Sequence, residues 1–598
     1  MATTTPKQSQ YLEINSFLGV DFANQEKDVD LRRSPWAVNM VSDLAGRPEK
    51  RPGYRAIGTY GERINGIHFP GEHCIVHSGT TLYIDGEAAY TQAKDAKSTM
   101  VYFAGRWLYL DGGNYLEFTG TGFAEIEGFI PTTVIGAAPE GGGEPFEAVN
   151  LIQPKRKNSF SADGEAIHFH LDAQDIDSVE SVSVGGSLTT DYVVDLEYGT
   201  VTFDEAPPDD KGVDSVVITF KKTVAGYADR IKKCRIASAY GLGNDSRLFL
   251  TGNPDAPNTD WQSGLFDPTY FPDTGYTEIG GESPLMGYVK QYDSQVIVKA
   301  QREGETTLFY RTAEMQEDGS VIFPVYEGLA GVGAVAEGCF LTAAGDPMFL
   351  AEGGLYGLTS DSLTSQRILQ LRSWYVNNRL LQEENLAEAV GTAWGRLAVI
   401  AANGHCYVAN TEFTNANMTG SYGYEWYYWE DVPARVLTEH EGKLYFGDSQ
   451  GKVYVFRGEE EGMAAYSDDG AAIRAVWTTP LLDGGNWMRT KTVAKKGTGI
   501  LVKPFQRSSG TIYFTTDKTI RQATKDYTLD IFDWDDVDFN RFTFNTRDDP
   551  KVIISPKKMR KVIYFQMSVE SGALNEGFGI MAMMVSFTMG NTLRRSYT

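Results

Sequence analysis

Histidine and cysteine gather in one short segment, residues 68–77, with the sequence HFPGEHCIVH. It contains His68, His73, Cys74 and His77, and imidazole nitrogen and thiolate sulfur are donors that Zn²⁺ prefers. On a β-strand, however, adjacent side chains point to opposite faces, so His73 and Cys74 would diverge while His73 and His77 share a face. Four convergent ligands would require a bend in the chain. We therefore interpret the segment as ordinary strand residues and predict no metal site.

Residues 331–336 match the spacing of a dinucleotide-binding loop, with Gly331, Gly333 and Ala336 in the expected positions. Such a loop should follow a strand and open a helix. The residues that come next include CFLTAAGDP, which is typical of a strand. The sequence therefore predicts no dinucleotide site and no bound cofactor.

An acidic segment near the C-terminus could supply oxygen ligands to Ca²⁺. It reads DIFDWDDVDFNRF and contains Asp530, Asp533, Asp535, Asp536 and Asp538. It lacks the central glycine of an EF-hand loop, and an acidic turn between strands explains it better. The motifs GxxxxGK[ST], HExxH and GxSxG do not occur in the sequence. We single out no catalytic residue and predict that the protein is not an enzyme.

The elements that must position these residues are mainly β-strands. Aromatic residues make up 12% of the chain, and 63 of its 598 residues are glycine, which favours strands and tight turns. This length exceeds the size of a single core, so we expect two to four domains. The four cysteines stand singly and indicate reduced, mostly buried thiols of a protein made in a cytoplasm. The absence of an apolar run of eighteen residues predicts no membrane-spanning helix.

Five strand-like runs recur at nearly equal spacing along the middle of the chain. They are RLFLT from Arg247, QVIVK from Gln295, PMFLA from Pro347, RLAVI from Arg396 and KLYFG from Lys443. Most are followed by a second run, such as GKVYVFR. A strand-rich repeat of roughly 40–50 residues is typical of a β-propeller blade, since one blade cannot bury both of its faces alone. We predict an all-β fold with a propeller of five to seven blades.

The region before these repeats is irregular. Two similar runs, TLYID from Thr81 and WLYLD from Trp107, are too close together for two full blades. The sequence EGGGEP (140–145) is typical of a linker, and the alternating residues after it predict an Ig-like β-sandwich. Insertion into a propeller loop costs little because closure entropy grows slowly with length.

The predicted domains follow from these patterns. They are an N-terminal arm (1–45), a propeller (46–145 and 226–465), an inserted Ig-like β-sandwich (146–225) and a C-terminal β-sandwich (466–598). One helix is expected near residues 362–390, with Ser362 or Thr364 as its cap.

Charge is distributed unevenly along the chain, whose net charge is -25. Residues 471–598 hold 19 Lys or Arg and 12 Asp or Glu, whereas residues 1–470 hold 35 and 67. An acidic chain repels phosphate backbones, which argues against nucleic-acid binding by the whole surface. The asymmetry indicates either a basic end that docks on an acidic neighbouring subunit or a drift in the charge of solvated faces. The interface cations of the basic end would be Lys557, Lys558, Arg560 and Lys561.

A second basic stretch, AGRPEKRPGYRAIG, covers residues 45–58 within the acidic part of the chain. Its two prolines exclude a helix and favour extended backbone at the residues before them. We interpret it as a stiff lead-in that joins the arm to the first blade. Its cations Arg47, Lys50 and Arg51 are then expected to anchor onto an acidic neighbouring subunit.

Three segments resemble virion proteins of tailed bacteriophages, in particular tail nozzle (tubular tail) proteins and related propeller-bearing hub or DNA-stabilising proteins. The first is SPWAVNMVSDLAGRPEKRPGYRAIG, which resembles the N-terminal lead into their propeller. The second and third are YSDDGAAIRAVWTTPLLDGGNWMRTKTV and KVIYFQMSVESGALNEGFGIMAMMVSF, in the C-terminal part. The sequence matches are approximate, but they occur in the same order along the chain. The inserted sandwich is not a fixed part of that family.

The resemblance implies a structural role in the virion tail. Such proteins are subunits of a ring, often sixfold, that contacts other head-tail or tail proteins, extends the DNA channel, retains the genome and passes it on infection. The acidic balance agrees with transient passage of double-stranded DNA without sequence-specific binding, since an anionic lumen would let DNA slide.

Two other functions stay open at this stage. One is a propeller enzyme that degrades polysaccharide, although no motif for it is present. The other is an adhesin, in which the inserted sandwich binds host glycan and aromatic residues of GYEWYYWED (423–431) form the platform. A buried blade edge is the simpler interpretation of that aromatic cluster.

Overall fold

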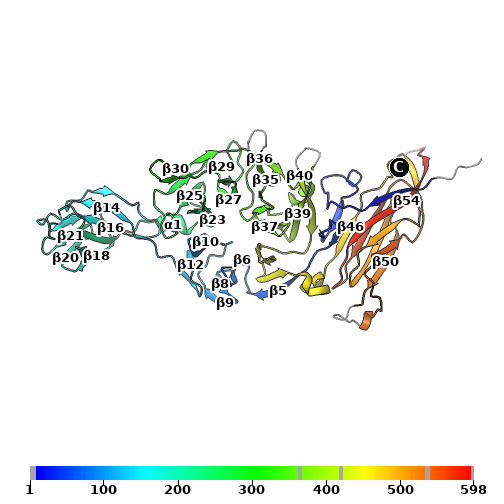
Figure 1. The fold of residues 1–598 in the computed structure, drawn as a ribbon, viewed down its shortest axis with the longest axis horizontal. Coiled ribbons are helices and arrows are strands. Elements are labelled where there is room, and N and C mark those ends of the chain that lie inside the picture. Colours follow the sequence, from blue (N-terminus) through cyan, green and yellow to red (C-terminus); the bar gives the residue numbers. More distant parts are fainter. Residues whose placement is uncertain (1–7, 210, 361–366, 417–421, 533–538, 594–598) are drawn as a thin grey trace, which may run out of the picture. The chain divides into compact units, whose positions relative to one another are not determined.

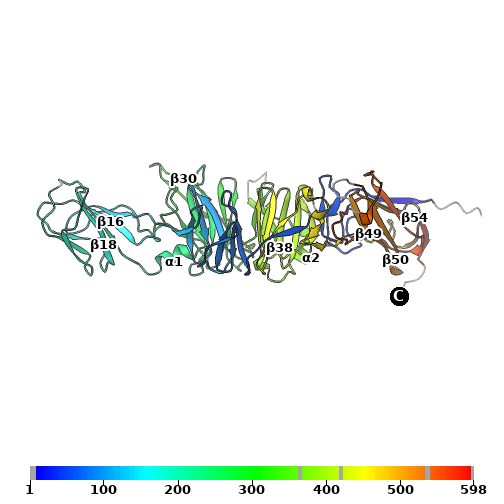
Figure 2. The same cartoon turned by 90° about the horizontal axis from the view of Figure 1, so that it is seen from below.

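The computed structural model describes residues 8–209, 211–360, 367–416, 422–532 and 539–593. The chain forms two compact units, one of residues 1–67 and 334–598 (unit 1) and one of residues 68–333 (unit 2). Strands dominate both units (Figures 1 and 2), so the predicted all-β class is confirmed. No helix in the described part of the chain is long and apolar enough to cross a membrane.

Four-stranded antiparallel sheets are the recurring element, and seven of them occur among the described residues. Three lie in unit 1: β33 (Phe340–Ala343), β34 (Asp346–Ala351), β35 (Gly354–Ser360), β36 (Arg367–Leu371); β37 (Val390–Trp394), β38 (Leu397–Ala402), β39 (His405–Ala416), β40 (Tyr422–Trp429); and β41 (Val436–His440), β42 (Lys443–Gly447), β43 (Lys452–Phe456), β5 (Tyr54–Thr59).

Three more sheets lie in unit 2: β10 (Thr99–Phe103), β11 (Arg106–Leu110), β12 (Tyr115–Phe118), β13 (Phe123–Glu125); β23 (Ile236–Tyr240), β24 (Arg247–Thr251), β25 (Thr259–Gln262), β26 (Tyr276–Glu278); and β27 (Leu285–Gln291), β28 (Ser294–Lys299), β29 (Leu308–Arg311), β32 (Val325–Glu327). The seventh is β6 (Ile64–His68), β7 (Ile75–Ser78), β8 (Thr81–Ile84), β9 (Glu87–Tyr90). A short hairpin of β30 (Glu314–Met315) and β31 (Val321–Ile322) projects before β32, and α1 (Tyr227–Lys232) precedes β23.

The five repeated runs of the sequence coincide with the second strands of five of these sheets, namely β24, β28, β34, β38 and β42. Four of them, β24, β28, β34 and β38, are almost completely buried, as expected where stacked sheets cover both faces of a central strand, whereas β42 begins with the exposed Lys443. The first strands of consecutive sheets lie side by side, β33 beside β37 and β37 beside β41 in unit 1, and β10 beside β23 and β23 beside β27 in unit 2. This is the stacking expected of propeller blades.

The expectation that TLYID and WLYLD are too close for two blades is wrong. TLYID lies in β8, the third strand of its sheet, and WLYLD lies in β11, the second strand of the next sheet. The strands of these two sheets have only three to five residues, and they are joined by tight turns with glycine at positive φ, such as Gly86 and Gly105. Two complete sheets therefore fit into residues 64–125.

The inserted domain is a sandwich of two sheets that share one buried core. One sheet contains β14 (Thr132–Ala137), β15 (Glu144–Pro145), β16 (Lys155–Phe160), β18 (Ser178–Val184), β19 (Ser187–Thr189) and β22 (Val216–Lys221), and the other contains β17 (His168–His170), β20 (Tyr192–Asp195) and β21 (Thr200–Phe203). The sandwich starts at Thr132, before the expected residue 146. EGGGEP is not a linker: its glycines form the turn between β14 and β15, where Gly141, Gly142 and Gly143 have positive φ.

The C-terminal sandwich consists of two sheets whose inward residues belong to the same core as the blades of unit 1. The first contains β47 (Arg489–Val493), β48 (Gly499–Val502), β51 (Lys551–Ile554), β52 (Met559–Val562) and β54 (Ile580–Thr592). The second contains β46 (Ala475–Thr478), β49 (Arg507–Thr516), β50 (Thr519–Asp530) and β53 (Phe565–Ser571). Two short strands, β44 (Ser467–Asp468) and β45 (Ala471–Ala472), precede them, and η4 (Phe539–Arg541) follows β50.

From Gln10 onward, the N-terminal segment pairs with strands of the C-terminal sandwich and of one four-stranded sheet, so residues 10–45 do not form a free arm. Its β1 (Gln10–Ile14) pairs with β54, β2 (Trp36–Val38) pairs with β46, and β5 completes the sheet of β41–β43. Between them, β3 (Met40–Ser42) and β4 (Pro48–Lys50) form a hairpin. Figure 1 shows these blue segments among the yellow and orange strands.

The expected helix at 362–390 is not formed. Arg367–Leu371 is strand β36, and the only helical turns in the described part of this range are η1 (Trp374–Val376), α2 (Asn377–Leu380) and η2 (Leu386–Glu388). The alternating RILQL segment pairs with β35, because completing a four-stranded sheet overrides helix propensity. The expected caps Ser362 and Thr364 lie outside the described residues. A longer 3-10 segment, η3 (Glu459–Tyr466), follows β43.

Candidate functional site

Lys50 and Arg51, two of the expected anchors for a neighbouring subunit, lie in the interior of unit 1. Their side chains are 1% and 0% exposed. A neighbouring subunit cannot reach them, so the expectation is wrong for these two residues. Arg47 is half-buried at the end of the turn before β4.

Arg51 instead holds the lead-in stretch against distant parts of the same chain. Its guanidinium donates two hydrogen bonds to the Asp468 carboxylate at 2.8 and 2.7 Å, and its Nε donates to Asn39 Oδ1 at 2.9 Å. Asn39 has a positive φ of 52°, which asparagine tolerates better than most residues. Gly53 completes the arrangement, because a Cβ there would lie 1.9 Å from the carbonyl oxygen of Ser467. Asn39 and the Arg51-Pro52-Gly53 residues of the lead-in therefore form one structural clamp.

Lys50 has a different set of contacts. Its Nζ donates to the carbonyl oxygen of Glu576 at 2.9 Å. Burial lowers the pKa of Lys50 to about 8, because desolvation disfavours the charged ammonium. This lysine therefore fixes the β3–β4 hairpin to the C-terminal sandwich.

The same hairpin borders a cleft of about 700 Å³ in unit 1, which we call the hairpin cleft. This volume lies within the range of small-molecule sites. Its walls come from four places: the β3–β4 hairpin, the turn between β37 and β38, the η3 segment, and the loop between β48 and β49. The residues that characterise it are Leu44, Trp394, Arg396, Arg457, Tyr466, Lys503 and Phe505.

The charged residues of the hairpin cleft are largely paired within the chain. Lys503 Nζ bridges the carboxylates of Asp43 and Glu49 at 2.8 and 2.7 Å. Burial raises the pKa of Glu49, although the bond from Lys503 acts in the other direction. Arg396 donates to the carbonyl oxygen of Ser42 at 2.7 Å and is still partly exposed. These contacts hold the hairpin in a defined position beside the cleft.

Apolar groups supply much of the remaining cleft surface. Leu44, at the tip of the hairpin, is 87% exposed. Tyr466 and Phe505 contact each other edge to face with ring centroids 5.6 Å apart. Leu44, Tyr466 and Phe505 thus place apolar surface beside the paired charges of the cleft.

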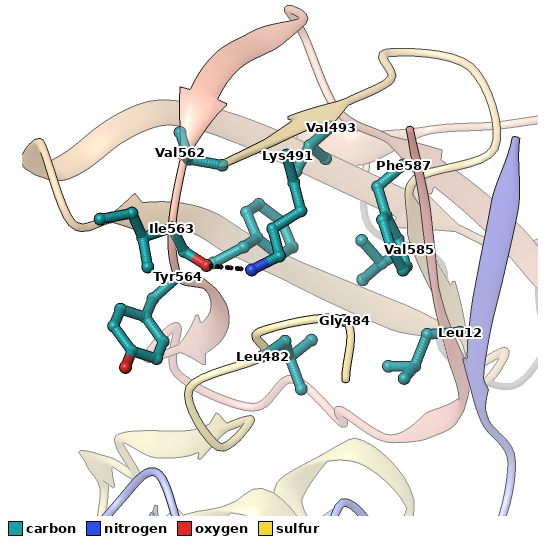
Figure 3. Close-up of a pocket in the computed structure, with 11 residues that line it drawn as sticks. Leu12, Leu482, Gly484, Lys491, Val493, Val562, Ile563, Tyr564, Val585 and Phe587 are labelled. Atoms are coloured by element: carbon teal, nitrogen blue, oxygen red, sulfur yellow. Dashed lines mark hydrogen bonds between the residues drawn. The ribbon is translucent and has the colours of Figure 1, made fainter. Parts of the chain in front are cut away.

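A second cavity, in the C-terminal sandwich, is too small for a ligand. Its volume is about 20 Å³, enough for roughly one water molecule. Figure 3 shows apolar side chains such as Leu12, Val585 and Phe587 around the buried Lys491. The Lys491 ammonium donates to the carbonyl oxygens of Asn486 and Ile563 at 2.5 and 3.0 Å. The cavity is therefore a small packing defect beside Lys491, whose ammonium has a structural role.

The zinc-type segment does not converge on a point. His68 bonds Ser98 at 3.0 Å, His77 bonds the carbonyl oxygen of Gly79 at 2.9 Å, and His73 bonds Asp85 at 2.7 Å. Burial lowers the pKa of His68 to about 3, so its imidazole is neutral. Among the described residues no group of three or more His, Cys, Asp or Glu could hold a metal ion. Asp533, Asp535, Asp536 and Asp538 lie outside those residues.

Two further sequence expectations concern exposure. The aromatic residues Trp426, Tyr427, Tyr428 and Trp429 are at most 1% exposed, so this cluster is no glycan platform but a blade strand covered on both faces.

The four cations of the basic C-terminal part, Lys557, Lys558, Arg560 and Lys561, are all exposed around β52. Their proposed part in an interface stays a prediction.

Sequence reasoning missed the hairpin cleft because its walls come from four segments that lie far apart in the chain. The basic lead-in was singled out, but its cations proved to be internal while the adjacent Leu44 is exposed. An apolar residue inside a polar turn, SDLAGR, was the one local signal for it.

Comparisons with known proteins give only weak similarities. No protein-family model matches the chain, and no curated protein matches it in sequence. Similar solved structures include BamB from Moraxella catarrhalis, at 10% identity and TM-score 0.29, covering 67% of this chain and 97% of that chain. Another is virginiamycin B lyase from Staphylococcus aureus, at 8% identity and TM-score 0.30, covering 75% and 99%.

Identities and TM-scores this low support no transfer of function. The class of the protein rests on its own sheets. It is an all-β protein built from four-stranded, blade-like antiparallel sheets, with two β-sandwiches attached.

Proposed function

We propose that this protein is a structural subunit of a bacteriophage tail that forms a ring or nozzle around the DNA channel, retains the genome and passes it during infection. The observation that carries the proposal is the way in which residues 10–59 are paired into three sheets made by residues 436–592. Separating the ends of unit 1 would require breaking strand pairs in all three sheets at once. Such construction suits a particle part that must resist the outward force of packaged DNA.

The four-stranded sheets are proposed to be blades of a β-propeller, as the sequence repeat predicts. Strand β5 supports this, since an N-terminal strand that completes a sheet of later strands ties the two ends of the repeat together. Ring closure covers the faces of the terminal sheets, which an open row of sheets would leave exposed.

Neighbouring subunits are proposed to contact each other through the hairpin cleft and the exposed cations of the C-terminal sandwich. Leu44 offers an apolar group for burial in such a contact. The charge asymmetry between residues 1–470 and 471–598 favours head-to-tail contact between copies, in a homo-oligomer expected to be a hexamer.

The test is the particle formed by the purified full-length chain. Negative-stain images should contain rings with a central hole, and light scattering should give a mass several times 66.0 kDa. A monomer under all conditions, including addition of phage tails that lack the protein, would contradict the proposal. A filter-binding titration at about 50 mM salt should retain no duplex DNA, because the chain is acidic.

An adhesin remains the second candidate because the inserted sandwich carries exposed apolar residues. Leu188 is 78% exposed, Val193 67% and Tyr198 61%. Deletion of residues 132–221 separates the two functions. Intact particles that no longer adsorb would favour the adhesin, whereas loss of assembly would favour a ring that needs this domain.

A further inference from the structure

The outer face of the first sheet of the C-terminal sandwich carries a continuous group of apolar residues. In this sheet β48 lies between β51 and β54. Residues opposite each other in an antiparallel pair point to the same face. Two neighbouring rows therefore cross the three strands on one face, Val552–Leu501–Ala582 and Ile554–Gly499–Met584.

This face is exposed, in contrast to the other side of the same strands. Val552 is 67% exposed, Ile554 44% and Met584 36%, whereas Ile500 and Met583 on the inner face are 1% exposed. We call the exposed side the β48–β51–β54 face. A contiguous group of exposed apolar side chains on a folded protein marks a surface that binds a partner.

Tyr11 extends this face onto the N-terminal strand β1. Glu13 is opposite Met584 in the pairing of β1 with β54, and Tyr11 lies two residues earlier, on the same side of the strand. Its side chain is 67% exposed. The apolar surface thus covers four adjacent strands.

The surroundings of this face are strongly cationic. Among the described residues of the six strands in this sheet, Glu13 is the only acidic one, and the basic ones are Arg489, Lys491, Lys551, Arg560 and Lys561. The turns beside the strands add four exposed lysines, Lys495, Lys496, Lys557 and Lys558. A partner that fits this face should therefore combine apolar with acidic side chains.

The inserted sandwich has that combination. Residues 132–221 contain 17 Asp or Glu and 5 Lys or Arg. Strand β20 is at an edge of its sheet, and with the turn that follows it exposes acidic and apolar side chains in alternation. The exposed residues are Asp191, Val193, Asp195, Leu196, Glu197 and Tyr198.

We infer that the β48–β51–β54 face docks residues 191–198 of the inserted sandwich of a second copy of this chain. Contact would remove Val552 and Ile554 of one copy and Val193 and Tyr198 of the other from water. The cations around the face would meet the carboxylates of the hairpin, which favours this orientation over others. Because the two surfaces differ, the contact can repeat from copy to copy. The inference rests on the proposed function, in so far as it requires copies of the chain to associate.

The first test is sedimentation velocity of the purified full-length chain over a range of protein and salt concentrations. Self-association should weaken as salt rises, because salt screens the exposed charges. V552D places a negative charge opposite the acidic hairpin and should weaken association by more than about tenfold, since like charges facing each other across an interface cost several kcal/mol. L265D is the matched control, because Leu265 is 62% exposed in unit 2, and it should associate like the unchanged protein.

The second test uses one charge-reversed variant of each surface, K557E/K558E and D191K/E197K. Asp195 is kept, because its carboxylate accepts hydrogen bonds from the backbone N–H groups of Glu197 and Tyr198 and caps the turn. Each variant alone should associate weakly. An equimolar mixture should associate again, because the unchanged hairpin of the first variant meets the unchanged face of the second.

Circular dichroism checks that each variant is folded. Association of V552D and K557E/K558E like that of the unchanged protein would overturn the inference, as would a mixture of the two charge-reversed variants that stays monomeric. Weakening by V552D without any effect of D191K/E197K would exclude residues 191–198 as the docked segment. Association that responds to these variants without forming rings would uphold the docking and count against the proposed ring.

Discussion

The Arg51–Asp468 pair gives the sharpest prediction about how unit 1 is held together. The two side chains are 0% and 7% exposed, and Arg51 also donates to Asn39 and to the carbonyl oxygen of Glu430 at 3.1 Å. Replacing Arg51 by alanine leaves the Asp468 carboxylate buried and without its cation. Removing one partner of a buried pair costs about 3–5 kcal/mol, so R51A should lower the free energy of unfolding of unit 1 by that amount.

The measurement is denaturant unfolding followed by tryptophan fluorescence, since the Trp429 ring lies 5.8 Å from the Arg51 guanidinium and reports on the same region. R51K is the conservative control, and its free energy of unfolding should lie between those of the unchanged protein and R51A, because lysine keeps the charge but not the bidentate hydrogen bond. In the double variant R51M/D468L both charges are gone, so it should be more stable than R51A. A loss below about 1 kcal/mol in R51A would refute the clamp that we describe, since that is the magnitude of an exposed pair.

Three other outcomes follow from the structure. Leu44→Asp should abolish assembly of the full chain. It should change the free energy of unfolding of the monomer by less than about 0.5 kcal/mol, because Leu44 is 87% exposed. Normal rings in electron micrographs of this variant would exclude the hairpin cleft as an interface. The hydrogen bond between His405 Nδ1 and Glu383, 2.8 Å long, raises the pKa of His405. The pair therefore stabilises the folded protein fully below about pH 6.5, and this stabilisation is lost as pH rises through the raised pKa. H405Q should thus destabilise the protein more at pH 5.5 than at pH 8.5, and the opposite trend in denaturant unfolding would exclude the ion pair. In unit 2, the Arg311 guanidinium donates hydrogen bonds to Asp260 at 2.7 and 2.9 Å, and both side chains are buried. R311A should lower the opening free energy of β25 and β29, measured by hydrogen exchange, by about 3–5 kcal/mol. Unchanged protection of these strands would contradict this prediction.

Much of the strand pattern could be predicted because it depends on neighbouring residues. The runs RLFLT, QVIVK, PMFLA, RLAVI and KLYFG are each short, apolar and bounded by turn residues, and each is a central strand. The same local reasoning failed for Arg367–Leu371, which pairs with β35. It also failed for EGGGEP, which turns a hairpin. In both cases the deciding partner lies outside the segment itself.

By itself, the sequence determined the all-β class, the rhythm of the blade strands, the presence of an inserted sandwich and the uneven charge, since these depend on composition and on spacing along the chain. Only the tertiary structure decided which charges face solvent. Lys50 and Arg51 looked like surface anchors but are buried, because Glu576 and Asp468 come from more than 400 residues away to meet them. The exposed Leu44 and the walls of the hairpin cleft likewise depend on contacts between distant segments, which local patterns do not encode.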